Sequence, residues 1–438
     1  MKLQAVLALA LAAGPLFGAR SLTLEEAQQL AAKNNRNLQL ARLKVEEALH
    51  KRAGARADYF PKASANAAYS YFSEKLGTTT TAGDLGLGFL PPPFPTVPVP
   101  INLVKQNLFF GNVTVGQPLT QLYKIEQGVR AADGEQHIAE ARAAQGEDEV
   151  RYAVEQLYYA LLTAQRQRQA AESRLAAAEQ LLVDTQNAVD TGNALRVASI
   201  GRRAGLLEAR QNLLTARNQE SDYTEALNLC IGLPATTALS LAEPPRPEFS
   251  IASADEAVRQ ALERSPEVRE ARAGIEKARA GVRAARAEYI PDVTALVQYY
   301  HQTGVPTLPG DFGAIGGALT YNLFDFGKRR ELVRERATLL QQAEENLRRA
   351  QDAVEQRVRK SYRIVEQASQ MVDVAREALA LRRESERLTR DQVELGLALK
   401  SAYADSQAAT ISSDADLFRA EAGWRLAVAE LKKDMALP

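Results

Sequence analysis

The 438-residue chain is poor in the side chains that carry most enzyme chemistry. It has one cysteine, Cys230, and three histidines, His50, His137 and His301, which are widely separated in the sequence. A single cysteine excludes an intrachain disulfide, and its place in the apolar stretch 227–231 predicts a buried, unreactive thiol. The sequence shows no metal-ligand spacing, no Gly-rich phosphate loop and no GxSxG motif. It therefore predicts no enzyme, no cofactor and no metal site.

A net charge is also lacking, because 54 basic residues balance 54 acidic ones. Proteins that bind nucleic acids usually carry a basic excess, so we expect no nucleic-acid partner. After residue 20, no stretch approaches the ~18 apolar residues that a membrane-spanning helix needs. If this chain enters a membrane, it must do so with strands.

The N-terminus does contain an apolar run. Lys2 precedes the apolar residues 5–13, and small residues follow at Gly18 and Ala19. This pattern predicts a secretory signal peptide at residues 1–19, with an ordinary buried N-terminal helix as the alternative. Because no cysteine lies near the expected cleavage point, a lipid anchor is not predicted.

The chain contains an internal repeat, in which one structural unit occurs twice. The motif that begins at Thr23 (TLEEA) returns at Ser253 (SADEA), and the motif at Tyr59 (YFP) returns at Tyr289 (YIP), each 230 residues later. Each copy opens with a capping-box pattern and closes its first helix at a proline. We therefore expect each copy to contain a helix, a strand, a loop, a strand, a long helix, a turn and a helix.

The ends of the two copies also match, with an offset of 204 residues. Gly192 pairs with Gly396, and the Leu-Pro pair that begins at Leu233 recurs at Leu437. The predicted organisation is repeat 1 at 20–234, a Pro-rich linker at 235–253 and repeat 2 at 254–438. The smaller offset reflects a surplus in repeat 1 at residues 78–108, whose proline density predicts a loop that forms neither helix nor ladder.

Each copy contains two segments of alternating polarity. They predict strands at about 62–76 and 109–121 in repeat 1, and at about 291–303 and 312–324 in repeat 2. Strands of about ten residues suit a tilted crossing of a bilayer, and aromatic rings near their ends suit the membrane–water interface. The candidate interface residues are Tyr69, Tyr71, Phe72, Phe109, Phe110, Tyr299, Tyr300, Tyr321 and Phe324. A soluble four-stranded sheet with these aromatics in its core is the alternative.

Four strands are too few to close a barrel, for which about eight is the practical minimum. Unpaired sheet edges in lipid cost several kcal/mol for each exposed backbone group. Membrane-embedded strands would therefore require oligomerisation. A dimer would supply eight strands and a trimer twelve, and the strand pattern itself does not choose between them.

Two proline-free regions predict very long helices. A helix that starts near Leu122 can continue to about Gly192, a length of roughly 100 Å. In repeat 2, apolar residues recur every seven positions from Val358 to Leu379, which is the spacing of a coiled coil. The apolar seam is narrow and rich in alanine, so it fits a hollow ring of helices, with a solid antiparallel bundle as the alternative.

These features together resemble the outer-membrane efflux protein family, the TolC-like channels. The resemblance is carried by the duplicated order of elements, the Tyr59 and Tyr289 helix ends, the strand-to-helix join at 319–328, and the turns at Gly192 and Gly396. It implies a mixed fold of α-helices and membrane β-strands, in which a homotrimer forms a 12-stranded outer-membrane β-barrel that continues as a periplasmic α-barrel.

The resemblance also implies a function and partners. The chain would be the passive exit duct of a tripartite efflux or type I secretion system, placed in outer-membrane lipid with a periplasmic helical extension. A periplasmic adaptor and an inner-membrane pump or ABC transporter would be its partners. The alternative functions are a periplasmic coiled-coil adaptor or scaffold, which would need only one hairpin and no membrane-length strands, and a soluble enzyme, which would need a cluster of reactive side chains.

The resemblance places the gate and the adaptor-docking site at the turns around Gly192 and Gly396. Asp405 matches one aspartate-ring position of the relatives, whereas Ala402 stands at the other ring position. The tyrosine and arginine that tie the gate of relatives shut would fall at Val393 and Ala398, so that lock is missing or rebuilt.

Two basic residues near the turns are further gate candidates. Arg196 and Lys400 are equivalent by the repeat and each lies four residues after its glycine. For Asp405, Arg196 and Lys400 alike, the alternative is a solvated helix face.

Overall fold

The computed structural model describes residues 22–74, 76–80, 99–245, 251 and 253–437. The predicted signal peptide and most of the Pro-rich insertion lie outside these residues. The elements of repeat 1 are α1 (Leu24–Asn34), α2 (Arg36–Ala57), β1 (Lys62–Tyr71), β2 (Leu76–Thr80), β3 (Val99–Val104), β4 (Asn107–Pro118), α3 (Leu122–Asp190) and α4 (Arg196–Ile231). Those of repeat 2 are α5 (Ala254–Arg264), α6 (Pro266–Ala287), β5 (Asp292–Thr303), β6 (Asp311–Thr320), α7 (Lys328–Glu394) and α8 (Lys400–Asp434).

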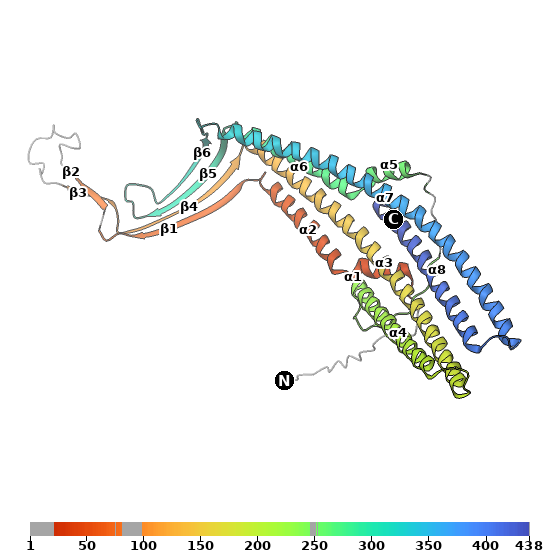
Figure 1. The fold of residues 1–438 in the computed structure, drawn as a ribbon. Helices are drawn as coiled ribbons and strands as arrows, with labels where there is room; N and C mark the ends of the chain where they lie inside the picture. Colours follow the sequence, from red (N-terminus) through yellow and green to blue (C-terminus); the bar gives the residue numbers. More distant parts are fainter. Residues whose placement is uncertain (1–21, 75, 81–98, 246–250, 252, 438) are drawn as a thin grey trace, which may run out of the picture. The chain divides into compact units, whose positions relative to one another are not determined.

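The chain forms two compact units (Figure 1). The first contains the described parts of residues 1–43, 141–269 and 349–438, and the second contains those of 44–140 and 270–348. The first unit holds α1, α4, α5, α8 and one part each of α2, α3, α6 and α7, and the second holds the remaining parts of those four helices and the described strands. No helix in the described part of the chain is both long enough and apolar enough to cross a membrane.

The first helix of each repeat is broken into two, which the sequence pattern did not predict. The breaks fall at Asn35 and Ser265, which are equivalent by the 230-residue offset and have non-helical backbone. The Asn35 side chain accepts the backbone N–H groups of Asn37 and Leu38, and so caps the start of α2. Proline at the first position of α6 has the same effect in repeat 2, because it favours a helix start and disfavours helix in the preceding residue.

The two predicted capping boxes differ. In repeat 1 the box is complete: the Glu26 N–H donates to the Thr23 hydroxyl oxygen at 3.2 Å, and the Thr23 N–H donates to the Glu26 carboxylate at 3.1 Å. In repeat 2 the Glu256 N–H donates to Ser253 at 3.2 Å, but the Glu256 carboxylate instead accepts hydrogen bonds from Gln260 and Arg259. Only half of the second box is therefore formed.

The central sheet is antiparallel, with strand order β1-β4-β5-β6. Its register aligns Ala63, Val115, Val297 and Ile315 in one row across all four strands. Because side chains alternate between faces along each strand, this row belongs to one apolar face. The opposite face carries mainly small and polar residues, such as Ser64, Asn66, Asn112, Thr114 and Gln298, together with an aromatic group of Phe110, Tyr300 and Phe312.

The strands are close to the predicted ones, with two differences. β1 ends at Tyr71 rather than near residue 76, and β6 ends at Thr320, before Tyr321 and Phe324. The predicted loop 78–108 also contributes a two-stranded ribbon, in which Pro100 of β3 is opposite Thr79 of β2. Both strands of such a ribbon are edge strands, and an edge strand tolerates a proline that a central strand would not.

The long helices pack along the predicted coiled-coil seam. Val358, Val365, Val372 and Leu379 on α7 are all buried, as are Val154 and Leu161 at the repeat-equivalent part of α3. An apolar core of the first unit surrounds Tyr158, with residues of α1, α3, α4 and α8. Cys230 at the end of α4 is half-buried rather than fully buried, and burial raises the pKa of its thiol.

Candidate functional site at the tips of the helical hairpins

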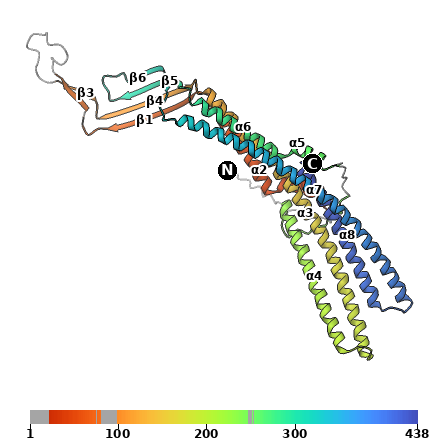
Figure 2. The same ribbon diagram turned by 45° about the horizontal axis from the view of Figure 1, so that its top comes forward.

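Two helical hairpins lie side by side in the first unit. Helices α3 and α4 form one, and α7 and α8 form the other; both views show the order α4, α3, α8, α7 (Figures 1 and 2). The inner helices α3 and α8 contact each other directly, because Arg174 donates a 2.9 Å hydrogen bond to the Ser412 hydroxyl.

Each hairpin turns at the predicted glycine. Gly192 and Gly396 have φ values of 74° and 73°, in the left-handed region that only glycine adopts without strain. In both turns the residue after the glycine donates its N–H to a carbonyl five residues earlier, Asn193 to Ala188 at 2.7 Å and Leu397 to Gln392 at 2.8 Å. Such bonds satisfy the last carbonyls of a helix, so both tips are well-defined turns.

Apolar side chains are exposed at both tips. Leu195 and Leu397 are 76% and 77% exposed, and Val197, Leu395 and Leu399 are exposed as well. Isolated exposed leucines are ordinary, but a cluster at the end of a helical hairpin indicates a contact surface.

The three gate candidates lie close to the tips but do not contact one another. Arg196 and Lys400 are the first residues of α4 and α8, and both are exposed. Asp405 is exposed on α8 and borders a hollow of about 280 Å³ that Arg174 of α3 and Glu208 of α4 also line. The structure therefore gives each candidate a solvated position and does not assign it a gating role.

A contact that the sequence did not predict joins the two hairpins. The Asp184 carboxylate on α3 accepts the backbone N–H of Ser401, at the start of α8, with a distance of 3.0 Å. Leu399, the residue before α8, has no side-chain acceptor for the first N–H groups of that helix. This lack of a local cap is the only feature of the sequence that indicates an acceptor from another segment.

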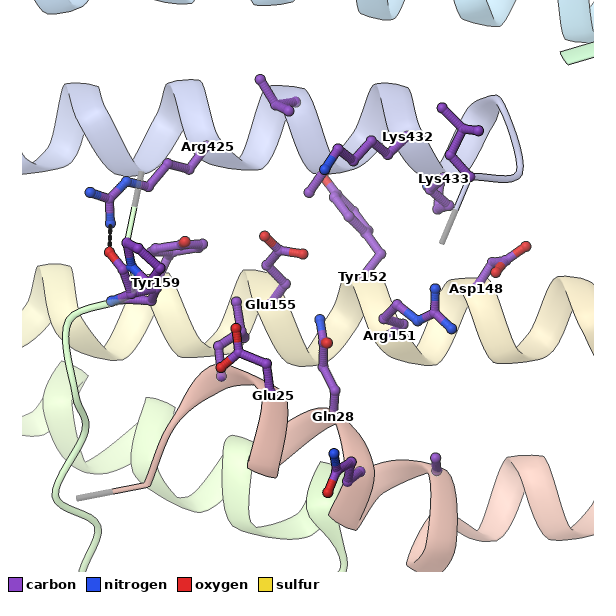
Figure 3. A pocket seen from close by; sticks show the side chains of 18 residues that line it. Glu25, Gln28, Asp148, Arg151, Tyr152, Glu155, Tyr159, Arg425, Lys432 and Lys433 are labelled. Carbon is purple, nitrogen blue, oxygen red and sulfur yellow. Dashed lines mark hydrogen bonds between the residues drawn. The ribbon is translucent and has the colours of Figure 1, made fainter. Parts of the chain in front are cut away.

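A second polar site lies at the other end of the hairpins, where α1, α3 and α8 meet (Figure 3). It is a pocket of about 640 Å³ that Glu25, Arg151, Glu155 and Lys432 line among others. Figure 3 shows Glu155 pointing from α3 toward α8, with Glu25 of α1 on the other side. Burial raises the pKa of Glu155 to about 7, Glu25 acts in the same direction, and Lys432 and Arg151 act against it.

Arg425 and Lys433 help to hold this pocket together. The buried Arg425 guanidinium donates to the Pro244 carbonyl at 2.9 Å and lies 5.8 Å from the centre of the Tyr159 ring. The Lys433 ammonium lies 4.3 Å from the centre of the Tyr152 ring. Acids and bases are mixed here, and the described residues contain no group of three or more His, Cys, Asp or Glu side chains that could hold a metal ion.

The sequence matches the family described as "Outer membrane efflux protein" over residues 27–233 and 257–436. These two segments cover most of the chain and coincide with the two repeats. The chain belongs to the outer membrane efflux protein family. A search among curated proteins gives no match for this efflux protein.

Solved structures agree with the fold of the efflux protein. The Campylobacter jejuni CmeC outer membrane channel has a TM-score of 0.77 at 15% identity, over 94% of this chain and 85% of that one. Vibrio cholerae VceC has a TM-score of 0.73 at 15% identity, covering 94% and 95% of the two chains. The open state of the Neisseria gonorrhoeae MtrE channel has a TM-score of 0.73 at 17% identity, covering 94% and 89%.

The efflux protein is thus an exit duct of the outer membrane, with long helices that extend into the periplasm. Two hairpins and a four-stranded sheet do not fit the alternative of a single-hairpin adaptor.

The nine aromatic residues predicted for the membrane interface of the efflux protein lie in three settings. Tyr69, Tyr71, Phe109 and Tyr299 belong by register to the apolar face of the sheet. Phe110 and Tyr300 belong to the other face, where they pack together and Tyr300 stacks on Phe312 at 4.9 Å. The remaining three, Phe72, Tyr321 and Phe324, follow strand ends.

Proposed function

We propose that three copies of this efflux protein form one passive channel. The observation that carries this proposal is the four-stranded sheet, whose outer strands β1 and β6 each pair on one side only among the described strands. In a membrane these open edges require partners, and further copies of the same sheet supply them. The exposed apolar face would contact lipid, and the face with Asn112, Thr114 and Gln298 would line the passage.

A trimer suits a duct better than a dimer. Two copies would form an eight-stranded barrel, whose interior is just wide enough for side chains to fill. Three copies would form a twelve-stranded barrel and leave room for an aqueous passage. The same three copies would bring twelve long helices together into a periplasmic tunnel, because each chain contributes α3, α4, α7 and α8, which lie side by side (Figures 1 and 2).

The duct would not power transport itself. We propose that a periplasmic adaptor docks at the tips, where Leu195 and Leu397 are exposed, and couples the channel to an inner-membrane pump or ABC transporter. Desolvation of these leucines on binding would contribute about 2 kcal/mol for each fully buried side chain. In this arrangement residues 1–19 direct the chain to the periplasm.

The test of the channel is its mass and conductance. Protein extracted from the outer membrane in mild detergent should have about three times the protomer mass, run as a heat-sensitive oligomer on gels, and conduct ions in planar bilayers without nucleotide. A purified species that is monomeric and shows no conductance in bilayers would contradict the proposal.

The docking surface has its own test. The double substitution Leu195→Asp and Leu397→Asp should abolish co-purification with the adaptor encoded by the same cells. Leu229→Asp is the matched control, because Leu229 is similarly exposed but lies near the opposite end of α4. Equal recovery of adaptor with both variants would show that the tips are not the docking site.

A further inference from the structure

The turn between β6 and α7 exposes large apolar side chains. Leu323, Phe324 and Phe326 are 88%, 73% and 90% exposed, and the two phenylalanine rings contact each other with their centres 4.5 Å apart. Contiguous apolar side chains of this size on a surface mark a site of interaction with a membrane or with another protein. The turn continues the apolar face of the sheet, on which Ile315 and Leu319 of β6 are exposed as well.

The internal repeat shows that this turn is longer than its counterpart. In repeat 1, the three residues 119–121 connect β4 to α3, whereas in repeat 2 the seven residues 321–327 connect β6 to α7. The short connection is sufficient to pass from a strand to a long helix. The longer connection is therefore not required by the change from strand to helix.

Phe326 has a backbone conformation that is unfavourable for a phenylalanine. Its φ is 54°, in the left-handed region that bulky side chains rarely adopt. The next residue, Gly327, is also left-handed, with a φ of 88°. Backbone strain of this kind persists only where the surrounding structure enforces it, and it is concentrated at functional sites.

Asp325 and Arg329 enforce the conformation of the turn. The Asp325 carboxylate accepts the backbone N–H of Gly327 at 3.0 Å and that of Arg329 at 3.1 Å, and Nε of Arg329 donates to it at 2.7 Å. The Arg329 guanidinium also donates to the Asn322 carbonyl at 2.6 Å. These contacts hold the turn in one conformation, in which the Phe326 ring stays exposed.

Two basic residues beside this turn have no acidic partner among the described residues. Lys328 and Arg330 are exposed in the first turn of α7, whereas Arg329 between them is paired. Lys124, which is equivalent to Lys328 by the 204-residue offset, forms an ion pair with Glu288. Positive charges in the first turn of a helix act against its macrodipole, so helix stability does not account for Lys328 and Arg330.

We propose that this turn anchors the chain to the periplasmic leaflet of the outer membrane, where Phe324 and Phe326 insert beside the acyl chains and Lys328 and Arg330 bind the phosphates of anionic phospholipids. This inference rests on the proposed contact between lipid and the apolar face of the sheet. The cations follow directly after the apolar side chains, which is the order of acyl chain and headgroup in a bilayer. Lipid is therefore a better match than a free anion.

The chemistry of the four side chains suits this depth in the membrane. Aromatic rings are favourable at the membrane–water interface, and basic side chains are attracted to anionic headgroups. Residues two apart project to different sides of a helix, so Lys328 and Arg330 contact separate headgroups. The rigid turn fixes the depth at which the rings enter, because Asp325 and Arg329 leave it little freedom.

Depth-dependent fluorescence quenching tests the anchor. The chain has one tryptophan, Trp424, so Trp424→Phe gives a background in which Phe326→Trp is the single reporter. In phosphatidylcholine vesicles this reporter should be quenched more by lipids brominated near the carbonyl end of the acyl chain than by lipids brominated near its methyl end. Ile315→Trp is the matched reporter on the apolar face of β6, and it should show the opposite preference.

The preference for anionic headgroups is tested with the same reporter. Brominated phosphatidylglycerol should quench Phe326→Trp more than brominated phosphatidylcholine does. Lys328→Gln with Arg330→Gln should lower this preference about fivefold for each charge removed, the usual contribution of one basic residue at an anionic lipid surface. Arg349→Gln with Lys360→Gln is the matched control, because both residues are exposed about 30 Å or more further along α7.

Phe326→Gly distinguishes an anchor from a structural role. Glycine adopts a φ of 54° without strain, so the oligomer of this variant should be at least as stable in detergent as the wild type. In phosphatidylglycerol vesicles the variant should lose part of the rise in unfolding temperature that the wild type gains on transfer from detergent. A loss of stability in detergent would show that Phe326 packs against a neighbouring copy and would overturn the anchor.

The outcomes separate the anchor from the proposed channel. If brominated lipids quench neither reporter, the lipid-facing side of the sheet is wrong and the proposed function fails with it. If they quench Ile315→Trp but not Phe326→Trp, only the anchor is overturned. If inorganic phosphate abolishes the preference for phosphatidylglycerol at an ionic strength at which chloride does not, the cations bind free anions and the lipid assignment is wrong.

Discussion

The Ser361 hydroxyl on α7 donates a 2.6 Å hydrogen bond to Oδ2 of Asp434, at the end of α8. Both residues are buried, and Oδ1 of Asp434 has no hydrogen-bond partner in the described part of the chain. Burial raises the pKa of this carboxyl, while the hydrogen bond from Ser361 acts against the shift. The Ser361 hydroxyl is therefore the main hydrogen-bond donor that offsets the burial of the Asp434 carboxyl, at the end of the second hairpin.

The first prediction concerns this hydroxyl. Ser361→Ala should lower the unfolding free energy of the first unit by about 1–3 kcal/mol, because it leaves a buried carboxyl without a donor. Thermal unfolding followed by circular dichroism in detergent would detect the loss. Ser385→Ala, at an exposed position of the same helix, should leave the unfolding curve unchanged.

The second prediction is a dependence of stability on pH. Burial raises the pKa of Glu155 from its ordinary value of 4.5 to about 7 in the folded chain, so the folded state binds this proton more tightly than the unfolded state. The cost of burying the charged form is absent below about pH 4.5, grows between 4.5 and 7, and is complete above 7. Burial also raises the pKa of Asp148 and Asp434, which act in the same direction.

The thermal unfolding temperature should therefore be higher at pH 5.5 than at pH 8. Glu155→Gln removes the titrating group and should reduce this difference. Glu147→Gln is the control, because Glu147 is half exposed in an ion pair with Arg42 and should leave the difference intact. Equal pH dependence in wild type and Glu155→Gln would exclude Glu155 as its source.

The third prediction compares two left-handed glycines. Gly396→Ala should cost about 1–2 kcal/mol, the ordinary penalty of a left-handed backbone, because a Cβ there would meet no atom within 4 Å. Gly232→Ala should cost more, since its Cβ would overlap the Asn34 side chain, which bonds the Ile231 carbonyl. Unfolding midpoints of the two variants would measure the difference, and equal midpoints would contradict the close packing at Gly232.

The fourth prediction tests the two faces of the sheet. Ile315 is 87% exposed on the apolar face, and the adjacent Ala314 points to the opposite face. Ile315→Arg should reduce the amount of oligomer in the outer membrane, because an arginine facing lipid costs about 2–4 kcal/mol near the midplane. Ala314→Arg should assemble normally. Equal assembly of both variants would show that the apolar face does not contact lipid.

Some features of this protein follow from local sequence patterns. The duplication, the long proline-free helices and the buried row from Val358 to Leu379 required only periodicity and the absence of helix breakers. The turns at Gly192 and Gly396 required only the backbone freedom of glycine. The pattern does not predict the helix break at Asn35. That break depends on one side chain, because the Asn35 amide oxygen accepts the N–H groups of Asn37 and Leu38 and so starts a new helix.

Local sequence patterns do not predict the contacts between distant residues that indicate the role of each residue. The family resemblance predicts Asp405 as a gate residue, and the repeat and the nearby turns predict Arg196 and Lys400, but their solvated positions do not distinguish a gate from an ordinary helix surface. Asp184 and Ser401 are 217 residues apart, so only the packing of α3 against α8 could bring them together. The split of the aromatic residues between two faces likewise depended on the register of β4 and β5.

The sequence by itself determined the elements and the duplication of this efflux protein, because periodicity, proline and glycine act within a few residues. The tertiary structure alone decided which helices are neighbours, which carboxylate caps α8, and which aromatic residues share a face of the sheet. Those relationships depend on the free energy of packing between distant segments, and no local pattern records it.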